Sequence, residues 1–425
     1  TGAAGGARGG AAANAHGGAA GSRTPPGRSV SLKGGGRANI RPNGQIRSVD
    51  RNGMHIEHGV RGGRTVVTEH NGARIVTRGR GGYVQRAYVT RGGHSYYSRT
   101  YYYHGAYRSG VYRGYYYGGH NYYGYYHPYW YHPGFYGWAY NPWATPVAWG
   151  LGAWGWGGSP WWGYYGSWWT PYPYYASPAF WLTDYLIAAN LQAAYQARQD
   201  AAAAADQGAA ADAAPADNGG GAPASANVTL TPEVKQAIAE EVKAQLEAQQ
   251  AQANQPAAAA APASAPANAN AQEVPPALDP AHRTFVVDTD VTAVNNGQEC
   301  ALSSGDVVTR LTDTPDQDQM VNASVSATKK SDCAAGQTVS VKVDDLQEMY
   351  NHFQEQLTSG MGELAKKQGT GGMPKAPDTG TTASDVPAPP PDNSAAKTLQ
   401  DQQTQADQTE TEVKQEAASS GGGTQ

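Results

Sequence analysis

The sequence predicts a mixed fold built from several segments: an N-terminal antiparallel β meander, an irregular aromatic tract, isolated helices, and a small C-terminal β domain that ends in a helix. Three observations predict it. Asn-Gly and Gly-Gly pairs recur near the N-terminus, tyrosine and tryptophan gather in one tract, and Ala/Pro-rich stretches separate the later segments. Because those stretches hold few aliphatic residues, we expect only about half of the chain to form an apolar interior.

The expected bounds follow from these shifts in composition. In order, the segments are a disordered basic Gly/Ala-rich head (1–36), the β meander (37–113), the Tyr/Trp/Gly-rich tract (114–176), a helix (177–206), a linker (207–227), a second helix (228–253), an Ala/Pro linker (254–281), the β domain with its helix (282–367) and a disordered tail (368–425).

The meander is predicted by turn pairs that recur every nine to eleven residues. These pairs are Asn43-Gly44, Asn52-Gly53, Gly62-Gly63, Asn71-Gly72, Gly81-Gly82 and Gly92-Gly93. Asn and Gly tolerate the positive φ angles of two-residue hairpin turns, and short β-branched runs lie between the pairs. The alternation predicts one modestly apolar face and one Arg-rich face. Such a face is too thin to be stable alone, so we expect it to pack on the aromatic tract or on another molecule.

Aromatic residues gather in and around the aromatic tract: 26 of the 28 tyrosines lie between Tyr83 and Tyr185, and all 11 tryptophans lie between Trp130 and Trp181. Glycine and proline interrupt it, which predicts irregular turns and extended pieces. Because each buried Tyr or Trp removes about 150–250 Å² from water, we expect more apolar surface than one chain can bury, and therefore self-association. The residues expected to mediate it are Tyr115, Tyr125, Trp130, Tyr131, Trp138, Trp143, Trp154, Trp161 and Trp168. The alternative is an ordinary core formed with the meander and the helix that follows.

Two helices follow the tract. Ser177 is a good N-cap with Pro178 at the first helical position, and the wide apolar stripe that follows predicts a packed helix. Thr231 and Pro232 begin the second helix in the same way. Its single narrow apolar ridge is marginal in isolation, so we expect it to fray or to pair with a partner helix.

The C-terminal β domain is predicted by strand-like runs separated by turns and followed by an amphipathic helix. The stretch "ECALSSGDVVTRL" followed by "QTVSVKV" resembles a small bacterial SH3-like barrel. The resemblance implies a domain that binds cell-wall material or partner peptides. Between His282 and Asp345, however, Phe285 is the only aromatic residue, which favours a structural module. The order of segments also resembles uncharacterised exported bacterial Tyr/Trp/Gly-rich envelope proteins.

Charge is distributed unevenly along the chain. Residues 1–115 contain 17 arginines and one lysine against Asp50, Glu57 and Glu69, a net charge of +15, whereas the remainder carries −19. This asymmetry predicts a basic arm for an anionic partner or for the acidic half of another copy; the alternative is that each half is only kept soluble by its charge. The arginines expected to bind a polyanion are Arg61, Arg64, Arg74, Arg78, Arg80, Arg86 and Arg91. Nucleic acid is not expected, because most RGG motifs coincide with turns.

The two cysteines, Cys300 and Cys333, predict a disulfide and hence an oxidising compartment; a pair of reduced core thiols is the alternative. No signal peptide is visible, although the chain begins at Thr1 without a methionine, which leaves earlier processing open. No run of 18 or more aliphatic residues is present, so we expect no transmembrane helix.

The sequence contains no motif of a catalytic site, and we expect no enzyme activity, metal or cofactor. The histidines of the tract lack a closed ligand spacing. The leading hypothesis is an exported, non-enzymatic structural protein of the cell surface or extracellular matrix that assembles into a homo-oligomer or polymer through its aromatic region. The alternative is a module that binds a polyanion, such as anionic polysaccharide or cell-wall material, through the Arg-rich meander.

Overall fold

The computed structural model describes residues 25–70, 72–79, 81–206, 230–254, 273–329 and 332–421. The predicted head and the two linkers therefore fall largely outside the described residues, as does Arg80.

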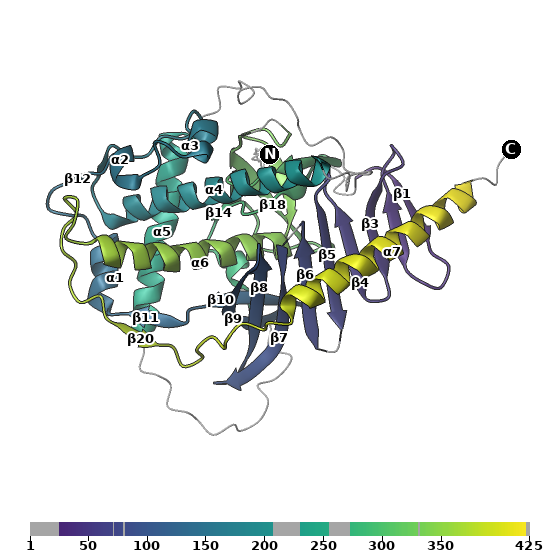
Figure 1. Cartoon of the computed structure of the whole chain (residues 1–425), viewed down its shortest axis with the longest axis horizontal. Coiled ribbons are helices and arrows are strands. Elements are labelled where there is room, and N and C mark those ends of the chain that lie inside the picture. The colour runs from purple at the N-terminus through teal and green to yellow at the C-terminus, as the bar shows by residue number, and fades with distance from the viewer. Residues whose placement is uncertain are drawn as a thin grey trace, which may run out of the picture.

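Ten strands form one antiparallel sheet in sequential order, which confirms the meander (Figure 1). They are β1 (Arg28–Ser31), β2 (Arg37–Ile40), β3 (Ile46–Arg51), β4 (Met54–His58), β5 (Arg64–His70), β6 (Ala73–Arg78), β7 (Gly81–Arg91), β8 (His94–Tyr103), β9 (Ala106–Tyr117) and β10 (His120–Tyr126). The β3–β4 turn has the positive φ angles that its sequence demands, at Asn52 and Gly53. The sheet starts before residue 37 and ends after residue 113, so the first part of the aromatic tract is strand rather than irregular.

The remainder of the aromatic tract and the helices after it form a helical flank beside the sheet. Its elements are β11 (Tyr129–Tyr131), α1 (Pro133–Tyr140), β12 (Val147–Ala148), α2 (Leu151–Trp154), α3 (Pro160–Tyr165), β13 (Tyr174–Tyr175), α4 (Pro178–Asp206) and α5 (Pro232–Ala253). The helices α4 and α5 begin where their Pro residues predict. The Thr231 hydroxyl caps α5 by accepting a hydrogen bond from the Val234 N–H at 3.4 Å.

A second antiparallel sheet carries the disulfide-bearing part of the chain. After the 3-10 helix η1 (Pro276–Leu278), it contains β14 (Thr284–Val286), β15 (Val291–Asn295), β16 (Gln298–Leu302), β17 (Val307–Arg310), β18 (Met320–Ala327) and β19 (Thr338–Lys342). The order is β14-β17-β18-β19-β15-β16, and among the described residues β14 and β16 are edge strands that do not pair to close a barrel. The resemblance to an SH3-like barrel therefore stays a prediction.

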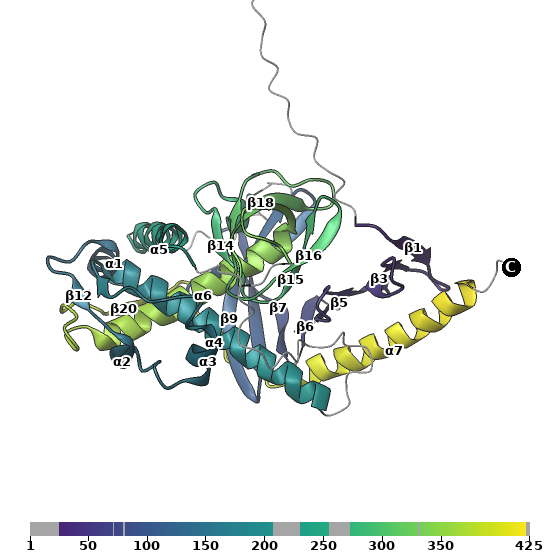
Figure 2. The same cartoon turned by 90° about the horizontal axis from the view of Figure 1, so that it is seen from above.

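Two long helices pack against the ten-stranded sheet. Helix α6 (Val343–Lys367) follows β19 and buries the apolar stripe predicted for it, including Leu346, Met349 and Leu357. After α6 the chain returns along β20 (Thr381–Ala383), which pairs with β11, and ends in α7 (Ala395–Gly421). The tail 368–425 was expected to be disordered; for its described residues, up to 421, β20 and α7 show that this prediction is wrong. Figure 2 shows α7 on one side of the long sheet and the six-stranded sheet on the other.

The two edges of the long sheet differ. At β10, Asn351 of α6 covers the edge: its side chain accepts a hydrogen bond from Tyr125 N–H and donates one to the Tyr123 carbonyl, both at 2.8 Å. At β1, three of the four residues are exposed, and no described strand pairs with its outer side. An uncovered edge strand presents unpaired backbone groups to other chains.

Candidate functional site

The aromatic residues expected to mediate self-association lie inside the chain. Tyr131, Trp161 and Trp168 are buried, and the other six are half-buried. Most of them pack in one core with apolar side chains of α4, α5 and α6, such as Leu186, Leu246 and Leu357. One chain thus buries more of this tract than expected, because these long helices supply apolar faces that cover most of it. Exposed rings remain at Tyr116 and Tyr174 within the tract and at Tyr88 and Tyr103 before it.

Tryptophan rings form the centre of that core. Trp154 stacks on Trp156 with ring centroids 4.2 Å apart and on Trp181 with centroids 4.5 Å apart. Trp181 is completely buried and also stacks on Tyr185. Each such ring pair contributes about 0.5–1.5 kcal/mol beyond the area it buries. The tract therefore stabilises the monomer.

The arginines expected to bind a polyanion do not share one face of the sheet. Arg64 pairs with Asp407 and Glu410 of α7, whereas Arg78, on the opposite side, lies 4.0 Å from Asp345 of α6. The prediction of a single Arg-rich face is wrong, because the basic residues of successive strands alternate between the two sides.

Each described arginine of this set has a carboxylate partner in the same chain. The pairs, besides those of Arg64, are Arg61–Asp332 (2.8 Å), Arg74–Glu69 (2.7 Å), Arg78–Asp288 (3.9 Å), Arg86–Asp392 (3.4 Å) and Arg91–Asp385 (3.3 Å). Most of these carboxylates come from the acidic part of the sequence. Arginines of the basic N-terminal part are thus neutralised largely by carboxylates of the acidic part of the same chain. The sequence had not predicted this pairing.

The most completely buried charge in the sheet belongs to Arg99, whose side chain is 0% exposed. Its guanidinium donates two hydrogen bonds to Glu348 of α6, at 2.8 and 3.1 Å, and one to Gln85 at 3.0 Å. The rings of Tyr83 and Tyr112 enclose it, with centroids 3.9 and 3.8 Å from the guanidinium carbon. Burial opposes ionisation of Glu348, but the charges of Arg99 and Arg78 and the hydrogen bonds from Arg99 together outweigh it and lower the pKa of that carboxyl.

A second ion pair lies beside the first. Arg108, whose side chain is 57% exposed, contacts the buried Glu355 of α6 at 2.6 Å, and the Tyr112 hydroxyl donates to the same carboxylate. Burial, followed by the negative charge of Glu355, raises the pKa of Tyr112 well above its usual value. The phenol therefore stays protonated and acts as a hydrogen-bond donor. Together with Arg99 and Glu348, these residues hold α6 to the sheet through charge-assisted hydrogen bonds. The sequence analysis missed this cluster.

Asp345, near the start of α6, has a pKa that burial shifts strongly upward. Burial raises its pKa to about 7, although Lys342 and Arg78 oppose the shift. A carboxyl whose pKa is higher in the folded chain takes up a proton on folding, so its contribution to stability falls as pH rises from about 4 to about 7.

We predict that Asp345→Asn removes this dependence. At pH 8 the variant should be more stable than the wild type by about 1–3 kcal/mol, since the wild type must there hold a poorly solvated carboxylate. Near pH 4, where Asp345 is protonated in the folded chain, the two should be nearly equal. Urea denaturation at both pH values measures the difference; equal curves at pH 8 contradict the prediction.

The predicted disulfide joins Cys300 of β16 to Cys333, which precedes β19. The bond closes a loop with a sequence separation of 33 residues inside the six-stranded sheet, and both cysteines are buried. Closing such a loop stabilises a folded domain by about 2–4 kcal/mol. The prediction of this bond is confirmed.

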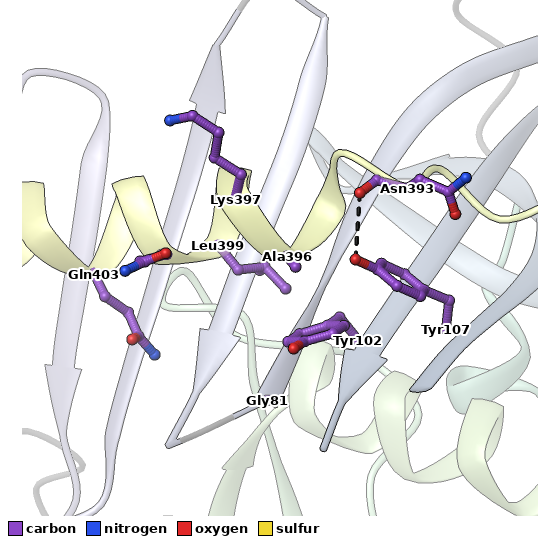
Figure 3. A pocket seen from close by; sticks show the side chains of 9 residues that line it. Gly81, Tyr102, Tyr107, Asn393, Ala396, Lys397, Leu399 and Gln403 are labelled. Atoms are coloured by element: carbon purple, nitrogen blue, oxygen red, sulfur yellow. Dashed lines mark hydrogen bonds between the residues drawn. The ribbon is translucent and has the colours of Figure 1, made fainter. Parts of the chain in front are cut away.

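A pocket of about 510 Å³ lies between the start of α7 and strands β7 to β9 (Figure 3). The rings of Tyr102 and Tyr107 line it together with Leu399. Three of its polar groups are engaged with the same chain: the Tyr107 hydroxyl donates to the Asn393 carbonyl at 3.3 Å, Lys397 pairs with Asp401, and the Gln403 side chain donates to the Gly79 carbonyl. The pocket therefore offers apolar contact but no convergent set of polar groups for a ligand.

Within the described ranges, no three His, Cys, Asp or Glu side chains are grouped so that they could hold a metal ion. No helix in this part of the chain combines the length and apolarity that a membrane span requires.

No protein-family model matches the sequence, and neither a curated protein nor a solved structure was found to be similar to it.

Proposed function

We propose that the protein is an exported, non-enzymatic structural protein of the cell surface or extracellular matrix, and that it associates with other copies of itself. The observation that carries the proposal is the asymmetry of the long sheet. Its β10 edge is covered by Asn351 of α6, whereas the β1 edge is uncovered among the described residues. Edge strands of this kind pair with strands of other chains. The disulfide supports an oxidising compartment.

In this proposal the aromatic tract has a different role from the one expected. Its rings make the helical flank rigid, and backbone pairing at β1 provides the contact between copies. Apolar contacts and backbone hydrogen bonds between chains persist in salt, whereas assembly driven by arginine weakens steeply.

We predict that sedimentation velocity of the wild type shows species larger than the monomer. The fraction of these species should increase with protein concentration and should not decrease when the salt concentration is raised. The double variant Ser29→Lys/Ser31→Lys should remain monomeric, because like charges on the edge of β1 repel a second copy. Leu311→Lys is the matched control, because it adds a lysine at an exposed position directly after β17, away from the β1 edge. It should associate as the wild type does. A wild type that is monomeric at every concentration and salt would exclude self-association.

The alternative function, a module that binds a polyanion or cell-wall material, has less support. The described arginines proposed for it are paired with carboxylates of the same chain. A polyanion would have to displace those partners. If the wild type forms larger complexes only when an anionic polysaccharide is added, and loses them in high salt, this alternative is favoured over self-association.

A further inference from the structure

One buried acid and one buried amine face each other in the helical flank. Asp184 lies in α4, and Lys235 lies in the first turn of α5. The Lys235 Nζ is 2.9 Å from Asp184 Oδ1, and the two side chains are 6% and 0% exposed, respectively. The ring of Tyr172 covers the amine, with its centroid 3.5 Å from Nζ, and Trp169 lies beyond it. The pair is therefore shielded from water by aromatic side chains.

The carboxyl group is held in one orientation by two donors to its other oxygen. The Tyr175 hydroxyl donates to Asp184 Oδ2 at 2.7 Å, and the Tyr172 backbone N–H donates to the same atom at 2.6 Å. The indole N–H of Trp154 donates to the Tyr175 oxygen at 3.1 Å, which fixes the phenol. Donors placed in this way stabilise negative charge that develops on a carbonyl oxygen during attack at its carbon.

The amine is also positioned by a hydrogen bond. Lys235 Nζ donates to the Thr170 carbonyl at 2.9 Å, so that the nitrogen stays beside Oδ1 of Asp184. One carboxyl oxygen is thus bound by two donors, while the other faces the amine. This arrangement distinguishes an oxygen that would remain as a carbonyl from one that would leave.

Burial favours the neutral form of both groups. It raises the pKa of Asp184 and lowers the pKa of Lys235, and in each case the charge of the partner opposes the shift without reversing it. The face of Tyr172 opposes the shift of the Lys235 pKa, since a ring face favours the ammonium form. A desolvated neutral lysine is a nucleophile, and a neutral carboxylic acid accepts attack more readily than a carboxylate.

We propose that Asp184 and Lys235 condense to form an intramolecular isopeptide bond. The Nζ lone pair attacks Cγ of Asp184, and the carbonyl electrons move to Oδ2, where the Tyr175 hydroxyl and the Tyr172 N–H stabilise them. One proton passes from Nζ to the Oδ1 hydroxyl, the Cγ–Oδ1 bond breaks, and one water molecule leaves as the carbonyl re-forms. The amide keeps the other Nζ proton, and no oxidant or further reactant is required.

The product would join α4 to α5 covalently across the residues that connect them in sequence. Because the surrounding rings exclude water, the amide would resist hydrolysis. The bond is a property of the single chain, so it holds or fails independently of the proposed association between copies.

Mass spectrometry of the purified, reduced and denatured wild type tests the proposal. The expected mass is that of the sequence less one water molecule. Lys235→Arg, which keeps the positive charge but lacks a nucleophilic amine, is the matched control and should have the full mass of its sequence. Asp184→Ala should do the same.

Tryptic peptides locate the bond. In the wild type we expect no cleavage after Lys235 and a cross-linked pair consisting of residues 114–198 and 199–243. Tyr175→Phe removes one donor to the carbonyl oxygen, so the cross-linked fraction in freshly made protein should fall several-fold. A wild type with full mass, cleaved after Lys235, would mean that the two residues form an ordinary ion pair and would overturn the proposal, whatever its state of association.

Discussion

Arg99→Ala should lower the free energy of unfolding by about 3–5 kcal/mol, because it leaves the carboxylate of Glu348 facing the sheet without its partner. The arginine is fully buried and donates two hydrogen bonds to that carboxylate. Removing one member of a buried pair costs far more than the net contribution of the pair, since the remaining charge stays desolvated. Urea denaturation followed by far-UV circular dichroism measures the loss.

Two further variants test this explanation. Arg91→Ala removes an arginine of the same sheet whose side chain is 50% exposed and whose partner, Asp385, is also accessible. It should cost less than about 1 kcal/mol. The double variant Arg99→Met/Glu348→Met removes both charges and should recover much of the loss. If Arg99→Ala and Arg91→Ala cost the same, the cluster beneath α6 does not stabilise the fold.

The meander could be predicted because its determinants are local. The turn at Asn52-Gly53 needs positive φ angles, and the sequence supplies residues that adopt them. The starts of α4 and α5 were predictable for the same reason, since Pro178, Thr231 and Pro232 mark them within a few residues.

The C-terminal helix could not be predicted from its own residues. Among the described part of α7, the large apolar side chains Leu399 and Val413 are the ones that become buried, and the rest is rich in Gln, Thr and acidic residues. Such a sequence is typical of a disordered tail. Its helix is stabilised by partners far away in the sequence, such as Arg51 and Arg64, which pair with Glu416 and Glu410.

The burial of most of the aromatic tract was predicted only as the alternative, for a related reason. Its own sequence lacks helical or strand periodicity, and the apolar faces that cover it belong to α4, α5 and α6. The charge cluster had only a partial signal: Glu348 and Glu355 are seven residues apart on α6, on the side of the helix opposite its apolar stripe. Carboxylates at that spacing share one face of a helix and require cationic partners when that face is buried.

Trp181→Ala should cost about 3–5 kcal/mol, in the range observed when a large buried aromatic residue is truncated. The ring is completely buried and stacks on Trp154 and Tyr185, so its loss leaves a cavity lined by rings that cannot easily move together. Stability in urea gives the magnitude. Quenching of tryptophan fluorescence by acrylamide gives a second measure, since the wild type should be poorly quenched and the variant more strongly.

Trp181→Phe separates packing from hydrogen bonding. The indole N–H of Trp181 has no hydrogen-bond partner among the described residues, so replacing the ring by phenylalanine removes a desolvated donor and leaves no acceptor unpaired. It should therefore cost clearly less than Trp181→Ala, about 1–2 kcal/mol for the volume lost. If the two variants were equally stable, or if acrylamide quenched the wild type freely, the tract would not be the core that stabilises the helical flank. The rings would then be accessible, and assembly through the aromatic tract would again be a candidate mechanism.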